Sequence, residues 1–591
     1  MFSFYTAPCA PGSSSGPAAA VPSAPGRRGI TAARSRPSVP AVRGRGRGRG
    51  RGRVASTDEP SFKSYDDPDT GNPIPPFNPS RPAGYHFGRP LLRNTMTMAV
   101  EFFYLFFTVE MMNDIVTHTN NYANEHIFSG THQSYAKPDG SWQDVTADEI
   151  KRLIAILIYF GLVKVVGDVD KYWSKKTLFH GLWARAILSR KRFKALMALL
   201  HVVDPATENK ADKLCKVESF INYFKSRCLD LYQPKQNLAV DERMVKSRHR
   251  SGIRQFIKDK PNKWGIKLWV LADSSNGYTV DFNVYIGKAA GQNVSANGLG
   301  YDVVMKLMRP FLNQGYRLFV DNFYTSVKLF KDLYNQGVVA TGTIIENRRE
   351  FPASLKDSKG WAKGRERGTM RWERVAPCLA IQWVDNKVVS LLTTIDNAND
   401  YGQVTRKCKT AGVWSTKVVS QPKAIANYNK YMNAVDRSDQ ILATNNVNRK
   451  CMRWWKTLFF HLIDIAVVNS FLLFKEHQAK FPDNVDLQRP THYSLGDFRE
   501  EIVRQLCDLP EYDVPPALSS VKPAPPSTSE FMTVHIPRFT DVQRRCVVCV
   551  KKNRGEFKVR SFCSAPQCRG QYMHVTTKNC FEEFHSEEYH K

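Results

Sequence analysis

The sequence predicts an α/β protein of several domains, and three features carry that prediction. The chain has 591 residues, more than one hydrophobic core usually organises. Helical periodicity dominates the first part and returns later, and a series of short strands lies between. The end of the chain is rich in cysteine and histidine, which predicts a small metal-binding domain there.

Composition restricts the class of partner. Lys and Arg number 85 against 55 acidic residues, giving a formal net charge of +30. This surplus favours nucleic acid as the partner. An anionic membrane surface is the weaker alternative, because the sequence shows no basic amphipathic helix with an apolar face. The apolar stretch Thr457–Phe474 contains His461, Asp464 and Asn469, which predicts a buried helix rather than a membrane span. We expect a nucleic acid partner and no membrane.

Residues 1–85 predict a disordered arm. They are rich in Pro, Ala, Ser and Gly, and Arg43–Arg53 reads RGRGRGRGRGR. Such a segment buries too little apolar surface to offset its chain entropy. It could neutralise phosphates without reading sequence, or it could be a low-complexity tail with little role.

Residues 90–236 predict a helical domain. Ala99–Met112 and Ile150–Val163 carry apolar residues at helical spacing, and Thr146 with Glu149 forms a capping-box pattern. Arg190–Val202 is a further helix with a basic first turn. This domain could dimerise and bind DNA, although a basic helix face is often only solvated.

The middle of the chain predicts a sheet. Three strands, a helix, a strand, a helix and a strand follow one another, which is the order of an RNase H-like core. The expected helices are Tyr301–Leu312 and Ser326–Asn335. The expected strands are Asn237–Val245, Gly265–Ala272, Tyr278–Ile286, Tyr316–Val320 and Val338–Ile345. Helical signal returns at Ile425–Ala443 and Met452–His477.

Aspartates in these segments predict a metal site. Asp241 lies within the first strand and Asp321 ends the fourth, and these strands are neighbours in an RNase H-like sheet. Asp436 and Asp439 share a helix face and could complete a site for two Mg²⁺ ions, which prefer oxygen ligands. Each aspartate alone could equally be a cap, a turn former or an ion-pair partner. Asp281 is expected on a solvated strand face.

The final segment predicts one or two zinc sites. Seven of the twelve cysteines are scattered singly, which favours a reducing, intracellular compartment, and the N-terminus lacks a signal-peptide pattern. Unliganded thiols are the alternative for the terminal group. Lys551 and Lys552 lie in a basic loop that agrees with DNA contact. The candidate ligands are Cys546, Cys549, Cys563, Cys568, His574, Cys580 and His585.

Ordered motifs across residues 90–591 resemble the piggyBac transposase family. Each is short, and together they are specific. They are Ala239–Glu242, Lys260–Lys267, the D-N-F-Y-T-S box Asp321–Ser326, the G-T box Gly342–Arg348, Tyr428–Gln440 and Arg453–Lys456. One departure is Asn433-Ala434 where the family usually has Gly-Gly, which puts full activity in question.

The resemblance implies a function. Asp241, Asp321 and Asp436 would be catalytic Mg²⁺ ligands and Asp439 a supporting acid. The reaction would be nicking, hairpin formation and strand transfer at TTAA sites of double-stranded DNA in the nucleus, by a homodimer. The zinc domain would bind transposon ends. Residues expected to contact DNA are Lys260, Lys263, Lys267, Arg453, Trp454, Lys551 and Lys552.

The same resemblance sets domain bounds and alternatives. Helices of 90–236 and 446–508 would form one dimerisation and DNA-binding domain, and 237–346 with 424–445 the RNase H-like catalytic core. An insertion domain at 347–423, a linker at 509–542 and a zinc-binding domain at 543–591 would follow. A domesticated DNA-binding protein without transposition activity is the alternative, and an Arg/Gly-armed RNA-binding protein is a third.

Overall fold

The structure is a computed structural model. It describes residues 63–87, 96–132, 135, 142–179, 181–258, 260–287, 294–410, 413–451, 453–510, 537–563, 568–575 and 578–586. The Arg/Gly run of the expected arm and most of the expected linker 509–542 lie outside these residues.

The last part of the expected arm is ordered. Asp69 pairs with Arg374 (Nε–Oδ1 2.5 Å), and the indole of Trp372 donates to the carbonyl of Ser64 (2.6 Å). Strand β1 (Gly84–Tyr85) pairs with β2 (Tyr232–Gln233). The prediction of disorder for residues 1–85 is therefore wrong for 63–85. Hydrogen bonds and a buried ion pair hold this proline-rich chain, although it buries little apolar surface.

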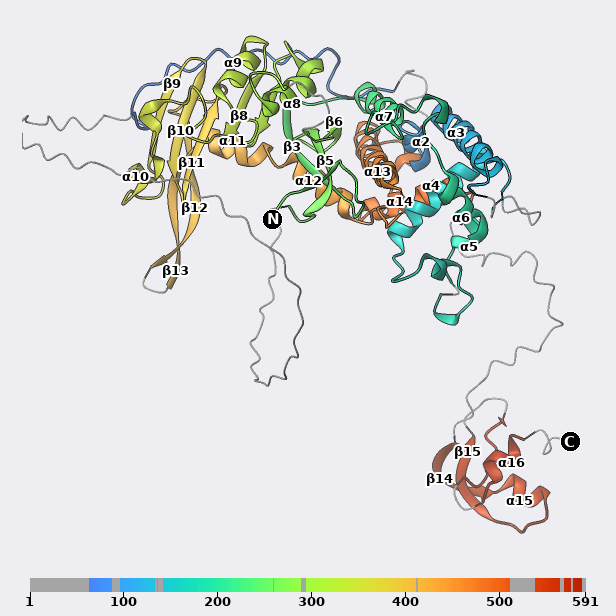
Figure 1. The fold of residues 1–591 in the computed structure, drawn as a ribbon. Helices are drawn as coiled ribbons and strands as arrows, with labels where there is room; N and C mark the ends of the chain where they lie inside the picture. The colour runs from blue at the N-terminus through green and yellow to red at the C-terminus, as the bar shows by residue number, and fades with distance from the viewer. Residues whose placement is uncertain are drawn as a thin grey trace, which may run out of the picture. The chain divides into compact units, whose positions relative to one another are not determined.

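A mixed sheet lies at the centre of the protein (Figure 1). Its first five strands run in the order β6-β5-β3-β7-β8, with β5 antiparallel to both neighbours and β3, β7 and β8 parallel. All five strands expected from the sequence are present. They are β3 (Asn237–Lys246), β5 (Trp264–Asp273), β6 (Thr279–Val284), β7 (Arg317–Val320) and β8 (Val339–Thr343); the short β4 (Arg254–Phe256) pairs with the start of β5.

Two helices link these strands. Helix α8 (Leu299–Met308) precedes β7 and contacts β5, and α9 (Val327–Asn335) precedes β8 and contacts it. The Ser326 hydroxyl caps α9 by accepting from the Leu329 amide (3.2 Å). Both helices match the sequence prediction.

The segment expected to be an insertion domain extends the same sheet. Strand β11 (Val388–Thr393) pairs with β8, β10 (Cys378–Val384) with β11, and β9 (Met370–Val375) with β10. Strands β12 (Tyr401–Thr410) and β13 (Val413–Pro422) form a separate two-stranded ribbon.

Helices from both sides of the sheet sequence pack together. Helix α13 contacts α2, and α14 contacts α2 and α4 (Figure 1). In the described part of the chain, only α13 is long and apolar enough to cross a membrane, and 83% of its apolar window is buried in the protein. The bounds are α2 (Ala99–Tyr104), α3 (Val109–Phe128), α4 (Ala147–Leu162), α5 (Ala184–Ile187), α6 (Arg190–Leu199), α7 (Glu218–Leu231), α13 (Trp454–Lys480) and α14 (Leu495–Leu506).

One expected helix is divided. The stretch Ala99–Met112 forms α2 and the start of α3, with a break before Thr108, whose hydroxyl accepts from the Met111 amide (3.3 Å). The break lets Phe106 and Phe107 become fully buried. A capping threonine and two aromatic anchors thus override a continuous helical pattern.

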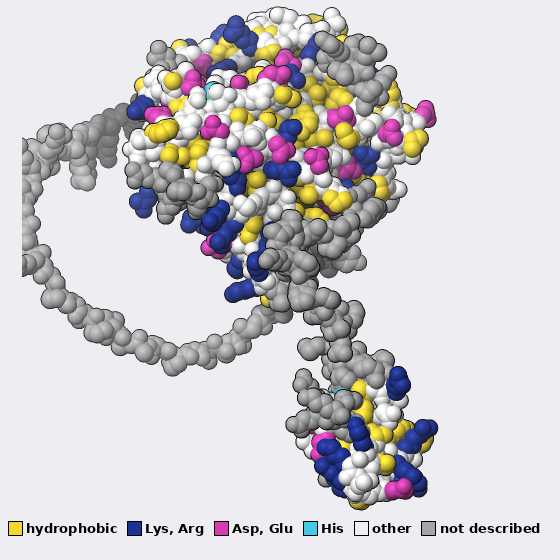
Figure 2. Space-filling model, turned by 90° about the vertical axis from the view of Figure 1, so that its right-hand side faces the viewer, with side chains coloured by type: hydrophobic (Ala, Val, Ile, Leu, Met, Phe, Trp, Pro, Cys, Tyr) yellow, Lys and Arg dark blue, Asp and Glu magenta, His cyan; other side chains and the backbone are white. Residues whose placement is uncertain are grey.

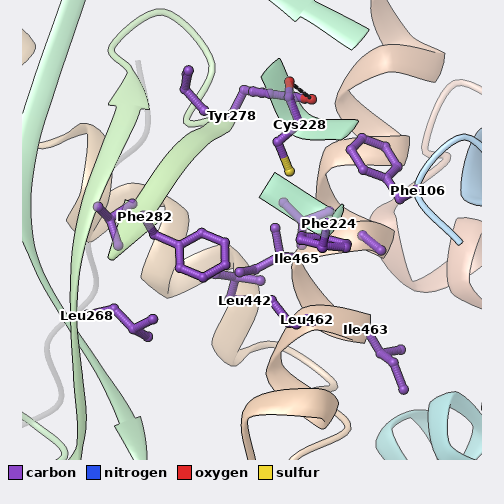
Figure 3. Packing of buried hydrophobic residues seen from close by; sticks show 14 of the residues in the cluster. Phe106, Phe224, Cys228, Leu268, Tyr278, Phe282, Leu442, Leu462, Ile463 and Ile465 are labelled. Atoms are coloured by element: carbon purple, nitrogen blue, oxygen red, sulfur yellow. Dashed lines mark hydrogen bonds between the residues drawn. The ribbon is translucent and has the colours of Figure 1, made fainter. Parts of the chain in front are cut away.

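The helices and the sheet share one hydrophobic core. Figure 3 shows Phe282 of β6 and Phe224 of α7 on either side of Ile465 of α13, with Phe106 beyond Phe224. Because this core is continuous, the sheet is held rigidly against α13.

The C-terminal module comprises the described residues from Pro537 to Ser586. Its strands β14 (Pro537–Arg545) and β15 (Lys558–Cys563) pair, and short helices α15 (Val547–Lys551) and α16 (Cys580–Phe584) accompany them. Its apolar core is small, and five of its nine buried members are cysteines. Figure 2 shows basic side chains over its surface.

Candidate active site

Asp241 and Asp321 lie side by side at the sheet. Val240 of β3 is in register with Val320 of the parallel strand β7, so the next residue on each strand is an aspartate. Asp241 is 9% exposed, and its Oδ1 accepts from the Glu242 amide (2.8 Å). Oδ1 of Asp321 accepts from the Phe323 amide (2.9 Å). The sequence expectation that these acids meet is therefore confirmed by the strand pairing.

Glu242 joins these two acids, and sequence reasoning did not single it out. One carboxylate oxygen from each of Asp241, Glu242 and Asp321 lies within 4.8 Å of the other two. We call these three residues the carboxylate cluster. Strand alternation would normally send adjacent side chains to opposite faces, which is why the pattern did not reveal Glu242.

The cluster's pKa values reflect burial and mutual repulsion. Burial and the hydrogen bond to Glu242 raise the pKa of Asp241 well above its usual range. Burial and the charge of Glu242 raise the pKa of Asp321. Burial also opposes ionisation of Glu242, but its hydrogen bond with Asp241 and the charge of Lys267 lower its pKa. The cluster is short of positive charge, which a bound cation would supply.

Lys260 connects the cluster to the third expected acid. Its Nζ lies 3.6 Å from Asp241 Oδ2 and 3.3 Å from Asp436 Oδ1, so one ammonium bridges the two carboxylates. Burial disfavours this charge, but Asp241 and Asp436 raise the pKa of Lys260 overall. Lys267 forms an ion pair with Glu242 alone (Nζ–Oε1 2.9 Å). Both lysines, expected to contact DNA, face carboxylates here.

Helix α12 (Ala434–Ala443) carries Asp436 and Asp439 and contacts β3 and β5. Asp436 lies in its first turn with a side chain 54% exposed, whereas Asp439 pairs with Arg243 of β3 (2.5 Å). Burial raises the pKa of Asp439 although Arg243 lowers it. The arginine thus fixes α12 on the strand that carries Asp241.

The departure from the family's Gly-Gly pair needs no unusual backbone. The helix expected at Ile425–Ala443 divides into α11 (Lys423–Tyr431) and α12, and Asn433 precedes α12 at φ −75°. Ala434 follows as a buried helical residue. Since neither position requires the left-handed region, a side chain is tolerated at both.

The turn after Asp321 is braced by the G-T box. Arg348 Nη2 donates to the carbonyls of Asn322 (2.7 Å) and Phe323 (2.8 Å), and the Thr325 hydroxyl donates to the Asp321 carbonyl (2.8 Å). A Cβ on Gly342 would lie 2.2 Å from Thr325 Oγ1 and 2.7 Å from the Val320 carbonyl oxygen. Glycine is therefore required for β8 to approach this turn.

Tyr324 adds an unpartnered hydroxyl beside the cluster. Tyr324 is 2% exposed, and its Oη has no hydrogen-bond partner among the described residues. Burial and the charges of Glu242, Asp241 and Asp321 raise its pKa well above the usual range. A neutral buried hydroxyl close to three acids can donate to a bound water or to phosphate.

These donors fit a hard divalent cation. The cluster offers carboxylate oxygens only, from two neighbouring strands. Asp436, the third acid expected from the sequence, lies outside this group, and Lys260 stands between it and Asp241. No described cysteine or histidine belongs to the group. The donor set suits Mg²⁺ or Mn²⁺ rather than a thiophilic metal.

The C-terminal module forms two groups of soft ligands. Cys546, Cys549, His574 and Cys580 are one group, and Cys563, Cys568 and His585 the other. The groups interleave along the chain, as a crossed arrangement requires. Sulfur and nitrogen atoms of the first lie 3.5–3.6 Å apart. This approaches the edge of about 3.7 Å of a tetrahedron with zinc–sulfur bonds of about 2.3 Å.

A further contact orients one of these ligands. His585 Nε2 lies 3.3 Å from Cys568 Sγ, and its Nδ1 lies 2.6 Å from the Phe581 carbonyl oxygen. A carbonyl acceptor fixes the proton on Nδ1, so that Nε2 carries the lone pair with which the ring would bind a metal.

The remaining residues expected at DNA lie at the surface. Lys263 is exposed before β5, Arg453 is exposed at the start of α13, and Trp454 is half-buried as its first residue. Lys551 and Lys552 are exposed at the end of α15, where Lys552 pairs with Glu583 (3.3 Å).

Comparison with known families defines the class. The family model described as Transposase IS4 matches residues 98–471, more than half of the chain. The chain therefore belongs to this transposase family, among its piggyBac-type members.

Two human proteins illustrate the relationship. PiggyBac transposable element-derived protein 3 (Homo sapiens) is 27% identical over 364 residues, which are 60% of this chain and 60% of that protein. PiggyBac transposable element-derived protein 2 (Homo sapiens) is 28% identical over 398 residues, 65% of this chain and 62% of that protein. The match thus spans less than two thirds of these relatives.

A solved structure agrees with this assignment. The piggyBac transposase synaptic complex with hairpin DNA superposes with a TM-score of 0.59 at 25% identity, covering 72% of this chain and 83% of that one. The mixed α/β architecture around the central sheet is shared with that transposase.

Proposed function

We propose that this chain is a DNA transposase of the piggyBac type that cuts and joins double-stranded DNA by metal-dependent phosphoryl transfer. One observation carries the proposal: in a chain of a transposase family, Asp241, Glu242 and Asp321 bring carboxylate oxygens within 4.8 Å of one another. Lys260 and Lys267 neutralise only two of these three carboxylates, and the excess negative charge favours a bound divalent cation.

The chain's own residues would each have a part. Two divalent ions, which we propose to be Mg²⁺, would supply an activated attacking oxygen and neutralise the leaving oxygen. Asp241, Glu242 and Asp321 would hold them from the sheet, and Asp436 from α12. Asp439 would keep α12 in place through Arg243. The same site would serve nicking, hairpin formation and transfer into TTAA targets.

The strand order β6-β5-β3-β7-β8, with its antiparallel and parallel halves, supports an RNase H-like core as the scaffold. We further propose a homodimer in the nucleus, with the helices around α13 contributing to dimerisation and DNA binding. The C-terminal module would take up two Zn²⁺ ions and contact transposon ends with Lys551 and Lys552.

An excision assay tests the proposal. A TTAA-flanked element is supplied with Mg²⁺, and loss of the element with one TTAA restored is measured. We expect excision by the wild type, none by Asp321→Ala, and wild-type excision by the exposed control Asp486→Ala. Equal excision by the wild type and Asp321→Ala would refute the catalytic assignment.

A second candidate is a domesticated DNA-binding protein. It is favoured by the bridging of Asp241 and Asp436 by Lys260 and by the element-derived relatives. This candidate predicts binding to DNA without excision under any divalent metal.

A further inference from the structure

A cavity of about 760 Å³ opens beside the ion pair of Arg243 and Asp439. It lies between the end of β3, the loop that follows it, and the connection from α12 to α13. Its floor includes the buried Val245 and Leu442 and the ring of His461 from α13. We call it the basic cavity.

Positive charge surrounds this cavity without compensation. Its walls include five cations that form no ion pair with any carboxylate in the described chain. Its acids, Asp439 and Asp464, are already paired with Arg243 (2.5 Å) and Arg499 (3.2 Å). Mutual repulsion of this kind favours a bound anion. The five cations are Lys246, Arg248, Arg250, Arg449 and Lys450.

Two buried polar atoms in the walls also lack partners. Nε2 of His461 and Nη1 of Arg449 are inaccessible to solvent and make no hydrogen bond with any residue that the structure describes. Burial and the charge of Arg243 hold the pKa of His461 well below its usual range, so the ring is neutral. A buried polar group left unpaired destabilises the protein, and a ligand's polar atoms would relieve this cost.

The cavity follows directly from the cluster along the strand. Arg243 lines it and lies two residues after Asp241, on the same face of β3 and about 7 Å further along. Asp439 also lines it, one helical turn from Asp436 on α12. A DNA strand bound at the carboxylates would therefore reach the cavity with its next nucleotides.

Size and chemistry select the ligand. The volume is in the range of sites that enclose a drug-sized molecule, so a nucleotide fits and a duplex does not. Cations at the exposed edge suit phosphates, and the apolar floor with a neutral imidazole suits a base. We propose that the basic cavity binds one or two nucleotides of a single DNA strand that has separated from the duplex beside the cleavage site. The inference rests on the proposed function for the identity of the polymer.

Binding measurements without divalent metal test whether the cations of the basic cavity bind a single DNA strand. Fluorescence anisotropy would compare a short single-stranded oligonucleotide with the matched duplex. For Arg250→Gln with Lys450→Gln we expect at least tenfold weaker single-strand binding. The slope of log affinity against log salt should fall by about 1.4, since two phosphate contacts are lost. The control pair Lys175→Gln and Lys176→Gln, exposed lysines outside the cavity, should stay within about twofold. Equal losses in both pairs would overturn the proposal.

A second variant tests the enclosed space. Ala443→Trp adds bulk at the exposed cavity wall and leaves every charge in place. We expect single-strand binding to weaken about tenfold while duplex binding stays unchanged, because only an inserted base needs the space. Unchanged single-strand binding, or displacement of the oligonucleotide by an acidic peptide of equal charge, would refute a nucleotide site.

The two proposals fail separately. Asp321→Asn cannot cleave, yet its single-strand binding should still fall at least tenfold when Arg250→Gln and Lys450→Gln are added. A wild type that binds through the cavity but never cleaves would refute the transposase proposal alone. Normal cleavage and strand binding by Arg250→Gln with Lys450→Gln would refute the cavity alone.

Discussion

The carboxylate cluster and the C-terminal module collect metal-binding groups in opposite ways. The cluster draws oxygen donors from β3 and from the end of β7. The continuous hydrophobic core shared by the sheet and the helices, which together we call the body, already positions these strands. The module draws sulfur and nitrogen donors from one short segment, and its small core consists largely of those ligands. Under the proposed function, a metal would be a reagent in the first region and a structural element in the second.

The largest effect should come from removing metal from the C-terminal module. Chelation, or Cys549→Ser, should unfold the module, because metal binding of about 10–16 kcal/mol replaces the core it lacks. Hydrogen exchange resolved along the chain would show lost protection in β14 and β15 and unchanged protection in α13. If α13 lost protection together with β14 and β15, the metal would not be a structural element of the C-terminal module alone.

Asp321→Asn should abolish function without loosening the fold. We expect strand cleavage to fall at least about a thousandfold, since several kcal/mol of charge stabilisation disappear. The melting temperature of the body should hold or rise, because a buried, repelling carboxylate is removed. Asp486→Asn, an exposed acid outside the cluster, is the matched control for a gel-based nicking assay.

Glu242→Gln should weaken Mn²⁺ binding by about ten- to a hundredfold, the range for a supporting ligand. Isothermal titration calorimetry of the protein with the zinc sites already filled measures this. Glu242→Asp should recover part of the affinity if the carboxylate binds the ion. If Gln and Asp behave alike, Glu242 serves only its ion pair with Lys267.

Lys260→Met should give the smallest effect. Without divalent metal, the free energy of unfolding should fall by less than about 1 kcal/mol, because partly exposed ion pairs contribute little. The melting temperature should therefore fall only slightly. Added Mg²⁺ should then raise the melting temperature more than in the wild type, since no ammonium competes for Asp241 and Asp436. Equal metal-induced shifts would mean that Lys260 and the cation do not share a site.

Most strands of the sheet and most candidate metal ligands could be predicted from the sequence, because their patterns lie within short segments of the chain. Strand patterns predicted β3, β5, β6, β7 and β8, which are all present. Cysteine spacing predicted the terminal candidate ligands, which the structure brings together in two groups. Asp241 and Asp321 followed from strand order.

The remainder depends on contacts between distant segments. Asp281, expected on a solvated face, is 8% exposed and pairs with Lys225 of α7 (3.1 Å), so that expectation was wrong. Nothing in the β6 pattern announces that a helix covers it. Glu242 and Tyr324 were missed for the same reason, since side-chain convergence is set by packing and not by alternation.

The most direct test of the account is to locate a metal in a crystal of the protein grown with Mn²⁺. An anomalous difference map should show a peak about 2.0–2.5 Å from carboxylate oxygens of Asp241 and Asp321. Asp321→Asn crystals should lack it. Wild-type crystals with no peak at these strand ends, or with Lys260 still bridging Asp241 and Asp436 at saturating Mn²⁺, would contradict a metal-dependent active site.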